Sequence, residues 1–239
     1  MLLDGNYVGS ELSLFAKARN WKRYILRELR PFIRGDVLEV GAGEGGTRRF
    51  LLSARWTSWT CLEPDRRLAG LLAKEVGLDP RTQVVESRLS GLDENRKYDT
   101  VLYIDVLEHI EDDRSELRLA AMHLRPGGAL VVLAPAHGWL FSKFDEAVGH
   151  YRRYSRSSLR AVGPSELNLI RLNYLDSVGL FASLANRLFL RQSIPTARQI
   201  AFWDSAMVPC SRVLDAVLLK ALGKTVVAVW QRRHGLANA

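Results

Sequence analysis

The chain has 239 residues, of which 47% are hydrophobic and 25% charged, and its formal net charge is +8. This composition is that of a globular protein, and two cysteines, Cys61 and Cys210, argue against a disulfide framework or a metal cluster. No uninterrupted apolar run reaches membrane-spanning length, and the first residues lack the blocks of a signal peptide. We therefore expect a cytoplasmic protein. Its positive charge favours acidic partners, namely an anionic small molecule, nucleic acid or an anionic membrane surface.

The first predicted element is a helix over residues 10–34. Apolar side chains recur there at roughly helical spacing, with lysines and arginines between them. Pro31 disturbs its end and Gly35 is a natural stop. Two roles fit such a helix, a cover over the mouth of a ligand site or simple packing at a sheet edge.

A strand, a glycine-rich turn and a helix start follow at residues 36–52. Val37 to Val40 predict a short strand, four glycines crowd into residues 41–46, and residues 47–52 predict the start of a helix. Glycines allow a sharp turn and a close approach of a ligand to the backbone, and a helix start offers unpaired N–H groups. The stretch fits a dinucleotide fingerprint through Gly41, Gly43 and Gly46. It fits a second pattern, acid-x-G-x-G-x-G, through Glu39, Gly41, Gly43 and Gly45.

Strands and helices then alternate, which predicts a parallel sheet covered on both faces. Six further strands are expected at residues 57–62, 82–86, 98–105, 129–134, 168–175 and 225–230. Helices are expected at residues 66–76, 113–124 and 158–162, and residues 137–158 have the character of a loop. A helical block is expected at 181–222, with breaks at Pro195 and Pro209.

Ligands of a parallel sheet bind at the carboxyl ends of the strands, and three more of these ends carry informative residues. Glu63 follows the second strand, at the distance from Glu39 expected of a ribose-binding acid. The fourth strand runs into an Asp-Val-Leu-Glu-His block at residues 105–109, and a Leu-Arg-Pro-Gly-Gly turn precedes the fifth at 124–128. Together with the glycine turn, these motifs resemble the class I S-adenosylmethionine (SAM) methyltransferases. A nicotinamide dehydrogenase needs neither of the last two blocks.

The resemblance implies an α/β, Rossmann-like fold with a doubly wound, seven-stranded sheet, mostly parallel with an antiparallel last strand. It implies a single methyltransferase domain over 1–239. An N-terminal helical segment (1–35) precedes the SAM-binding core (36–135). A substrate-side loop, strand six and a helical lid follow at 136–224, and the last strand and tail at 225–239. The helical block is thus an insertion before the last strand.

The resemblance also assigns roles around the cofactor SAM. Glu39 would face the ammonium group of SAM and Glu63 its ribose, while Ser87 and Arg88 occupy the adenine-contacting position. The full set of cofactor-binding candidates is Glu39, Gly41, Gly43, Gly45, Glu63, Ser87, Arg88, Asp105 and Val106.

A block rich in aromatic and basic residues, His150-Tyr151-Arg152-Arg153-Tyr154-Ser155, resembles one found in a subset of small-molecule methyltransferases. Neighbours in an extended segment point opposite ways, so at most one of the two arginines faces a substrate. The other would anchor the loop on an acid such as Asp145, and a purely structural role for both is the alternative. The substrate-binding candidates are Tyr103, His109, Tyr151, Arg152, Arg153 and Tyr154.

Transfer of a methyl group to oxygen or nitrogen also requires removal of a proton, which suits a neutral histidine. We place His137 first as the catalytic base, because it follows the fifth strand directly, and His150 second. No metal is expected. A lone histidine in either place has a structural role as its alternative.

The sequence therefore predicts a SAM-dependent methyltransferase that acts on an oxygen, a nitrogen or a carbon of a small, anionic metabolite. The +8 charge prompts a nucleic acid (RNA) methyltransferase as an alternative, although no nucleic-acid motif is present. The basic and apolar block 181–222 prompts another, a non-catalytic SAM-binding or membrane-surface protein. The chain is expected to be a monomer or a homodimer.

Overall fold

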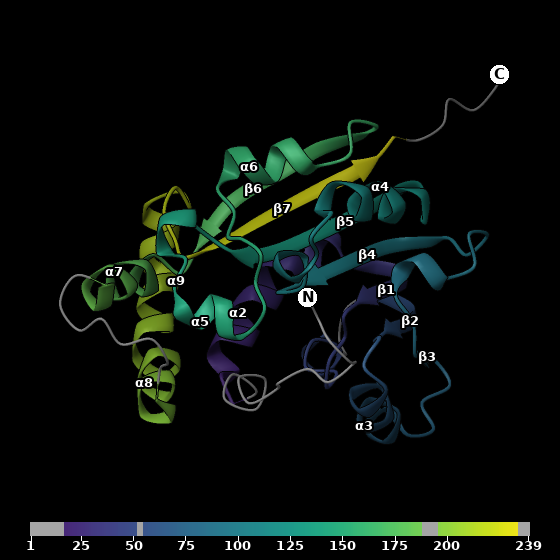
Figure 1. The fold of residues 1–239 in the computed structure, drawn as a ribbon, viewed down its shortest axis with the longest axis horizontal. Helices are drawn as coiled ribbons and strands as arrows, with labels where there is room; N and C mark the ends of the chain where they lie inside the picture. The colour runs from purple at the N-terminus through teal and green to yellow at the C-terminus, as the bar shows by residue number, and fades with distance from the viewer. Residues whose placement is uncertain (1–16, 52–54, 188–195, 234–239) are drawn as a thin grey trace.

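The computed structural model describes residues 17–51, 55–187 and 196–233. Its centre is a seven-stranded sheet with the order β3-β2-β1-β4-β5-β7-β6 (Figure 1). β7 pairs antiparallel with both neighbours, and the other pairs are parallel. The strands are β1 Arg34–Val40, β2 Arg55–Leu62, β3 Thr82–Val85, β4 Tyr98–Ile104, β5 Leu124–Pro135, β6 Leu167–Leu175 and β7 Thr225–Arg232. The Rossmann-like sheet with one antiparallel strand, predicted from the resemblance, is confirmed.

Each face of the sheet buries one of two hydrophobic clusters, because successive side chains of a strand point to opposite faces. In β1, Val37 belongs to the first cluster and Leu38 to the second. The first cluster joins the sheet to α2 Arg19–Leu29, α3 Arg66–Val76, α8 Ala197–Phe202 and α9 Val208–Val217. The second joins it to α4 Asp113–Met122 and α6 Arg156–Val162. α7 Ser177–Ala185 packs beside α9, and α5 Lys143–Ala147 follows β5 (Figure 1).

The chain order of the strands reverses at β1. From β1 the chain moves outward to β2 and β3, and then returns to β4 on the other side of β1. The carboxyl ends of β1 and β4 therefore flank a topological switch point, which is where ligands of such sheets bind. No helix among residues 17–51, 55–187 and 196–233 has the length and apolarity needed to cross a membrane.

Several elements differ from the sequence prediction. The helix expected after the glycine turn is only a 3₁₀ turn, Arg48–Phe50, because Arg48 and Arg49 are tied to acids of the α3 region, Asp79 and Glu75. The N-terminal helix ends at Leu29 and is followed by a 3₁₀ turn, Arg30–Phe32, and the part of the prediction before residue 17 lies outside the described residues. The expected loop at 137–158 contains the short helix α5.

Two predicted interruptions also behave differently. Pro209 does not break the helical block, because it occupies the first turn of α9 and a π-helical turn, Trp203–Met207, joins α8 to α9 without a loop. Pro195 lies outside the described residues. The turn at residues 125–128 lies inside β5, since Leu124 already pairs with Tyr98 and a register shift absorbs the extra residues.

Candidate functional site

A pocket of about 660 Å³ lies at the carboxyl edge of the sheet. The ends of β1 and β4 form its base, through Glu39, the glycine turn and Asp105. Helix α2 and the helical block contribute walls, among them Trp21 and Trp203. The pocket therefore occupies the switch point of the sheet, and its lining runs from Arg19 near the start of the described chain to Thr225 near its end.

The glycine turn has the backbone conformation that its sequence predicts. Gly41, Gly43 and Gly45 have φ values of 66°, 53° and 76°, in the left-handed region that favours glycine. A Cβ atom on Gly41 would lie 2.7 Å from the side chain of Val106, so β4's continuation packs directly against the turn. A Cβ atom on Gly45 would lie 2.5 Å from Leu72 of α3. Gly41 and Gly43 line the pocket, whereas Gly45 lets α3 pack behind it.

The two predicted acids of the cofactor site lie on either side of this turn. Glu39 lines the pocket with only 2% of its surface exposed, and it accepts a hydrogen bond from Trp59 Nε1 at 2.9 Å. Burial raises the pKa of Glu39 to about 7, against hydrogen bonds from Thr47 and Trp59. Glu63 lies behind the turn and accepts the backbone N–H groups of Gly43 and Asp65. Burial also raises the pKa of Glu63.

Helix α2 covers the glycine turn with a lysine that the sequence prediction missed. Lys22 lines the pocket, and a Cβ atom on Gly46 would lie 2.7 Å from its Nζ atom. Burial and the charge of Arg49 lower the pKa of Lys22, while Glu44 and Glu39 raise it. Two roles were predicted for the N-terminal helix, and the part around Lys22 takes the first of them, because it covers the ligand site.

His150, which lines the pocket, forms a hydrogen-bonded pair with Asp145. The Nδ1 atom of His150 is 2.9 Å from Asp145 Oδ1, and Asp145 is completely buried. Arg153 donates from Nε and Nη2 to both oxygens of Asp145, at 2.7 and 3.0 Å. Burial alone would raise the pKa of Asp145, but the hydrogen bonds from His150 and Arg153 hold it well below its usual range. Asp145 stays charged, so it fixes the proton of His150 on Nδ1 and leaves Nε2 to accept.

His150 and two neighbouring side chains could together hold a metal ion, although the sequence led us to expect no metal. One ligand atom from each of Glu108, His109 and His150 lies within 4.8 Å of the others. Glu108 is 1% exposed, and its Oε2 atom has no hydrogen-bond partner among the described residues. Burial and the charge of Asp105 hold the pKa of Glu108 well above its usual range, while burial lowers the pKa of His109 to about 4. Burial thus disfavours the charged forms of Glu108 and His109.

Comparison with known proteins identifies the family. A family model described as a methyltransferase domain matches residues 14–166, well over half of the chain. The chain belongs to this methyltransferase family. The resemblance that the sequence motifs predicted is therefore confirmed, and with it the enzyme class.

Curated relatives of this methyltransferase match over part of its length. Two of them, from Rickettsia conorii and Parvibaculum lavamentivorans, are named ubiquinone biosynthesis O-methyltransferase. They are 28% and 29% identical over 100 and 110 residues, or 41% and 44% of this chain. The matched stretches span 34% and 42% of those relatives' own length.

Solved structures share the fold over almost the whole methyltransferase. A SAM-dependent methyltransferase from Clostridium acetobutylicum matches with a TM-score of 0.60 at 10% identity, covering 95% of this chain and 100% of that one. Phosphoethanolamine N-methyltransferase 2 from Haemonchus contortus, in complex with SAM, matches with a TM-score of 0.63 at 14% identity. That match covers 94% of this chain and 58% of the other. These identities show the fold alone.

Three of the aromatic and histidine candidates lie outside the pocket of the methyltransferase. Tyr103 is completely buried in the sheet and donates to Glu116 of α4, so it does not face a substrate. Tyr154 is 1% exposed and donates to Asp113. The Nε2 atom of His137 is 2.9 Å from the carbonyl oxygen of Gly223, and its ring packs against Tyr174.

Of the two neighbouring arginines, one anchors the loop on Asp145, as predicted. Both arginines form ion pairs within the protein. Arg153 is the one bound to Asp145, and it also lines the pocket. Arg152 points away, to Asp113 at 2.7 Å and to the carbonyl of Glu111. Tyr151 is 39% exposed beside it.

Ser87 and Arg88 lie just past the carboxyl end of β3, where Ser87 Oγ donates to the carbonyl of Arg88. They are not part of the pocket lining. His109 and Asp105 do line the pocket. Asp105 has a φ of 53°, and part of its surface is exposed. Desolvation of its carboxyl group raises the pKa of Asp105 to about 6, while the charges of His150 and Lys224 lower it.

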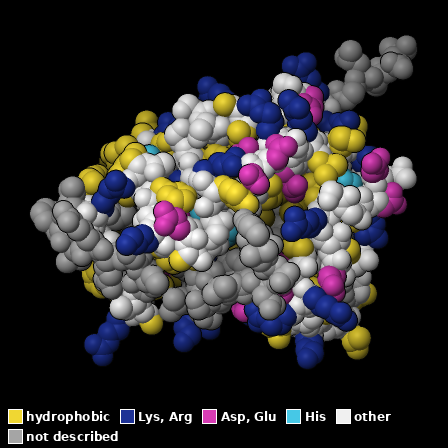
Figure 2. All heavy atoms as spheres, in the orientation of Figure 1, with side chains coloured by type: hydrophobic (Ala, Val, Ile, Leu, Met, Phe, Trp, Pro, Cys, Tyr) yellow, Lys and Arg dark blue, Asp and Glu magenta, His cyan; other side chains and the backbone are white. Residues whose placement is uncertain are grey.

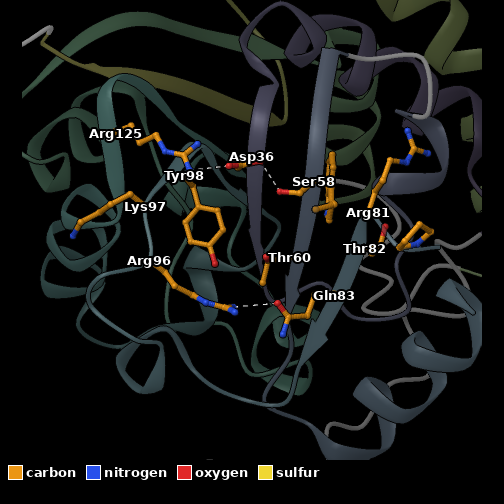
Figure 3. Close-up of a pocket in the computed structure, with 12 residues that line it drawn as sticks. Asp36, Ser58, Thr60, Arg81, Thr82, Gln83, Arg96, Lys97, Tyr98 and Arg125 are labelled. Carbon is orange, nitrogen blue, oxygen red and sulfur yellow. Dashed lines mark hydrogen bonds and ion pairs between the residues drawn. The ribbon is translucent and has the colours of Figure 1, made fainter. Parts of the chain in front are cut away.

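A second hollow, of about 400 Å³, lies at the opposite, amino edge of the sheet (Figure 3). Its cations are held by neighbouring groups of the fold. Arg125 forms an ion pair with Asp36, and Arg96 donates to Gln83 (Figure 3). Arg125 also pairs with Asp99. These contacts brace the starts of the strands, and we assign this hollow no ligand.

Proposed function

We propose that this methyltransferase transfers the methyl group of SAM to an oxygen atom of a small, anionic molecule. One observation carries the proposal. A single pocket joins the glycine turn, which suits the cofactor, to the His150–Asp145 pair, which suits removal of a proton from the acceptor. The name of the curated relatives supports oxygen over nitrogen or carbon as the acceptor atom.

The residues around the glycine turn fit SAM. Gly41, Gly43 and Gly46 line the pocket, so the amino acid part of SAM would rest on this turn. Glu39 would accept from the ammonium group, and Lys22 would pair with the carboxylate. Glu63 would accept from the ribose hydroxyls with its remaining lone pairs, since each carboxylate oxygen has two.

SAM, when bound, supplies an electrophilic methyl group on a sulfonium ion. The protein's contribution is alignment of the acceptor oxygen, which is worth up to about 7–11 kcal/mol in favourable cases. His150 Nε2 would take the proton of the acceptor hydroxyl while that oxygen takes the methyl group from the sulfonium sulfur, which leaves S-adenosylhomocysteine, and Asp145 would stabilise the resulting imidazolium. Of the two candidate bases we prefer His150, because it lines the pocket and His137 does not.

The remaining proposed roles concern adenine, the methionine part of SAM and the acceptor. Ser87 and Arg88 remain our proposal for contacts to adenine, because they follow β3 beside Glu63's strand. Asp105 and Val106 would lie near the methionine part of SAM, where Val106 packs on Gly41. His109 would contact the acceptor from the same side as His150, since their rings are 4.6 Å apart.

The face of the molecule drawn in Figure 2 does not favour the RNA alternative. On the face shown in Figure 2, Lys and Arg side chains are scattered, with Asp and Glu between them. A nucleic-acid surface typically gathers its positive charge in one patch or stripe.

A methyl-transfer assay tests the proposal. The purified protein is incubated with SAM labelled in its methyl group and with a panel of phenols, catechols, amines and total RNA. We expect label in a phenol or catechol, and none when SAM is omitted. Label that enters only RNA or amines, or none of the panel, contradicts the proposed function.

A further inference from the structure

Lys224 reaches the pocket because β7 runs antiparallel to the rest of the sheet. The residue directly precedes Thr225, the first residue of β7, which pairs with Pro135 at the carboxyl end of β5. The backbone of Lys224 is fixed on both sides, since its N–H donates to Asp176 at 3.2 Å and its carbonyl accepts from Ala136 at 2.8 Å. The lysine is therefore held rigidly at the ligand edge of the sheet.

The ammonium group of Lys224 has no hydrogen-bond partner among the described residues within 3.5 Å. Its nearest acid oxygen is Asp176 Oδ2 at 3.8 Å, and its Nζ atom lies over the ring of Trp203, 4.6 Å from the centroid. Asp176 is already engaged, because it accepts from Trp203 Nε1, Ser211 Oγ and the N–H of Gly179. Lys224 thus presents donors to the pocket while its side chain is only 29% exposed.

Of the other cations of the pocket, Arg19 and Arg23 lie exposed on α2, and the remaining three are engaged within the fold or over the glycine turn. Arg153 is held by both oxygens of Asp145, and Arg49 is paired with Glu75. Lys22 lies over the glycine turn, where the proposed function places the cofactor. Burial lowers the pKa of Lys224, and the charges of Asp176 and Asp105 counter this shift. A partly desolvated ammonium without a hydrogen bond is stabilised by an anion, because charge-assisted hydrogen bonds are stronger than neutral ones.

We propose that Lys224 binds a carboxylate on the acceptor, and that the acceptor is an aromatic hydroxy acid. The inference rests on the proposed function, because it places the acceptor beside His150 in the same pocket. Lys224 and His150 line the same pocket, so the carboxylate and the reacting hydroxyl can lie at two ends of one small molecule. Asp105 and Glu108 also line the pocket, which favours an acceptor of single negative charge over a phosphate dianion. Trp203, Phe144 and Ile104 offer apolar walls for a ring.

Binding of a matched pair of probes tests the inference without requiring turnover. The probes are 3,4-dihydroxybenzoate and 3,4-dihydroxybenzamide, which differ in charge but hardly in shape, titrated by calorimetry into protein saturated with S-adenosylhomocysteine. The wild type is expected to bind the benzoate about tenfold or more tightly than the amide, the usual strength of a charged hydrogen bond. Lys224→Met should remove this preference and Lys224→Arg should keep part of it. Lys74→Met, on the exposed surface of α3, is the matched control and should leave the preference unchanged.

Each contrary outcome overturns the inference. Equal binding of the two probes, binding of neither, or a preference that survives in Lys224→Met shows that Lys224 does not read a carboxylate. Loss of S-adenosylhomocysteine affinity in Lys224→Met, with the probe preference intact, assigns the lysine to the cofactor instead. Failure of the proposed function is seen separately, as absence of methyl transfer by a protein that still prefers the benzoate.

Discussion

Among single residues, the two histidines proposed as the catalytic base differ in their relation to the pocket, which the sequence alone did not reveal. His150 is oriented by Asp145 and lines the pocket, whereas the Nε2 atom of His137 is hydrogen-bonded to the carbonyl oxygen of Gly223. His150→Ala is therefore expected to lower kcat by about 10²–10⁴, the range for loss of a general base, with little change in S-adenosylhomocysteine affinity. Steady-state kinetics on an accepted phenol measure this. A wild-type kcat in His150→Ala excludes it as the base.

His137→Gln is the matched control for that experiment. The amide can still donate to the carbonyl of Gly223, so kcat should stay within a fewfold of wild type. If kcat falls as far in His137→Gln as in His150→Ala, His137 becomes the preferred catalytic base again, as its place after β5 suggested.

Glu39 gives the site a pH dependence of definite sign. Burial raises its pKa to about 7, so the free protein holds Glu39 protonated at pH 6. An ammonium group beside Glu39 favours the carboxylate, so binding at pH 6 should release a proton from it. The affinity for S-adenosylhomocysteine is therefore expected to rise with pH from about 6 to 7. Calorimetry in buffers of different ionisation enthalpy counts the released protons.

Glu39→Gln isolates this contribution from the other buried acids of the pocket. In this variant the proton release should fall by up to one per site, and the rise in affinity with pH should flatten. Unchanged proton release in Glu39→Gln would show that Glu39 does not meet the ammonium group.

Residues of the site were predictable where a local motif carries them. Glu39, Gly41 and Gly43 lie in one short stretch, and the structure brings them to the pocket together. Lys22 and Lys224 were not among the predicted site residues, since they reach the pocket only through the position of α2 and the reversed direction of β7. Tyr103 was misplaced because one residue along a strand changes the face to which a side chain points.

At the scale of elements, one buried aspartate ties the helical block to the sheet and to α2. Asp215 of α9 accepts from Tyr24 Oη and from the backbone N–H groups of Asp176 and Ser177, all within 2.9 Å. Asp215→Ala would leave these buried donors unpaired, so we expect a loss of about 3 kcal/mol or more in the free energy of unfolding. Urea denaturation measures it.

A surface aspartate provides the comparison. Asp112 caps α4 by accepting from the N–H of Ser115, and Asp112→Ala should cost only about 1 kcal/mol. Equal losses in the two variants would contradict the role of Asp215 as the link between α9, α2 and the end of β6.

Elements followed their sequence signals when those signals were local. The bounds of α3 match the prediction, because Asp65 caps its start and Gly77, with a φ of 60°, ends it. The segment after the glycine turn did not become a helix, since Arg48 makes ion pairs with residues some 30 positions away. Pro209 does not end the helical block, because a π-helical turn precedes it and continues the helix. The amino-acid composition does not predict such a turn.

At the scale of the whole molecule, the pocket collects walls from both halves of the chain. Helix α2, the sheet edge, α7 and the π-helical turn all contribute, through residues such as Trp21, Ser183 and Trp203. A cofactor that touches these parts together stabilises the fold as a unit. At a hundred times its Kd, S-adenosylhomocysteine should add about 2.7 kcal/mol and raise Tm by about 5–10 °C. A thermal melt with no shift would contradict a site built in this way.

The central claim is that the carboxyl-edge pocket binds SAM rather than a dinucleotide, although the glycine turn fits both patterns. Calorimetric titration of the wild-type protein with S-adenosylhomocysteine and, separately, with NAD decides between them. We predict saturable binding of one S-adenosylhomocysteine per chain, weakened by Gly41→Val, whose side chain would collide with Val106, and no saturable binding of NAD. Binding of NAD in place of S-adenosylhomocysteine would contradict the account.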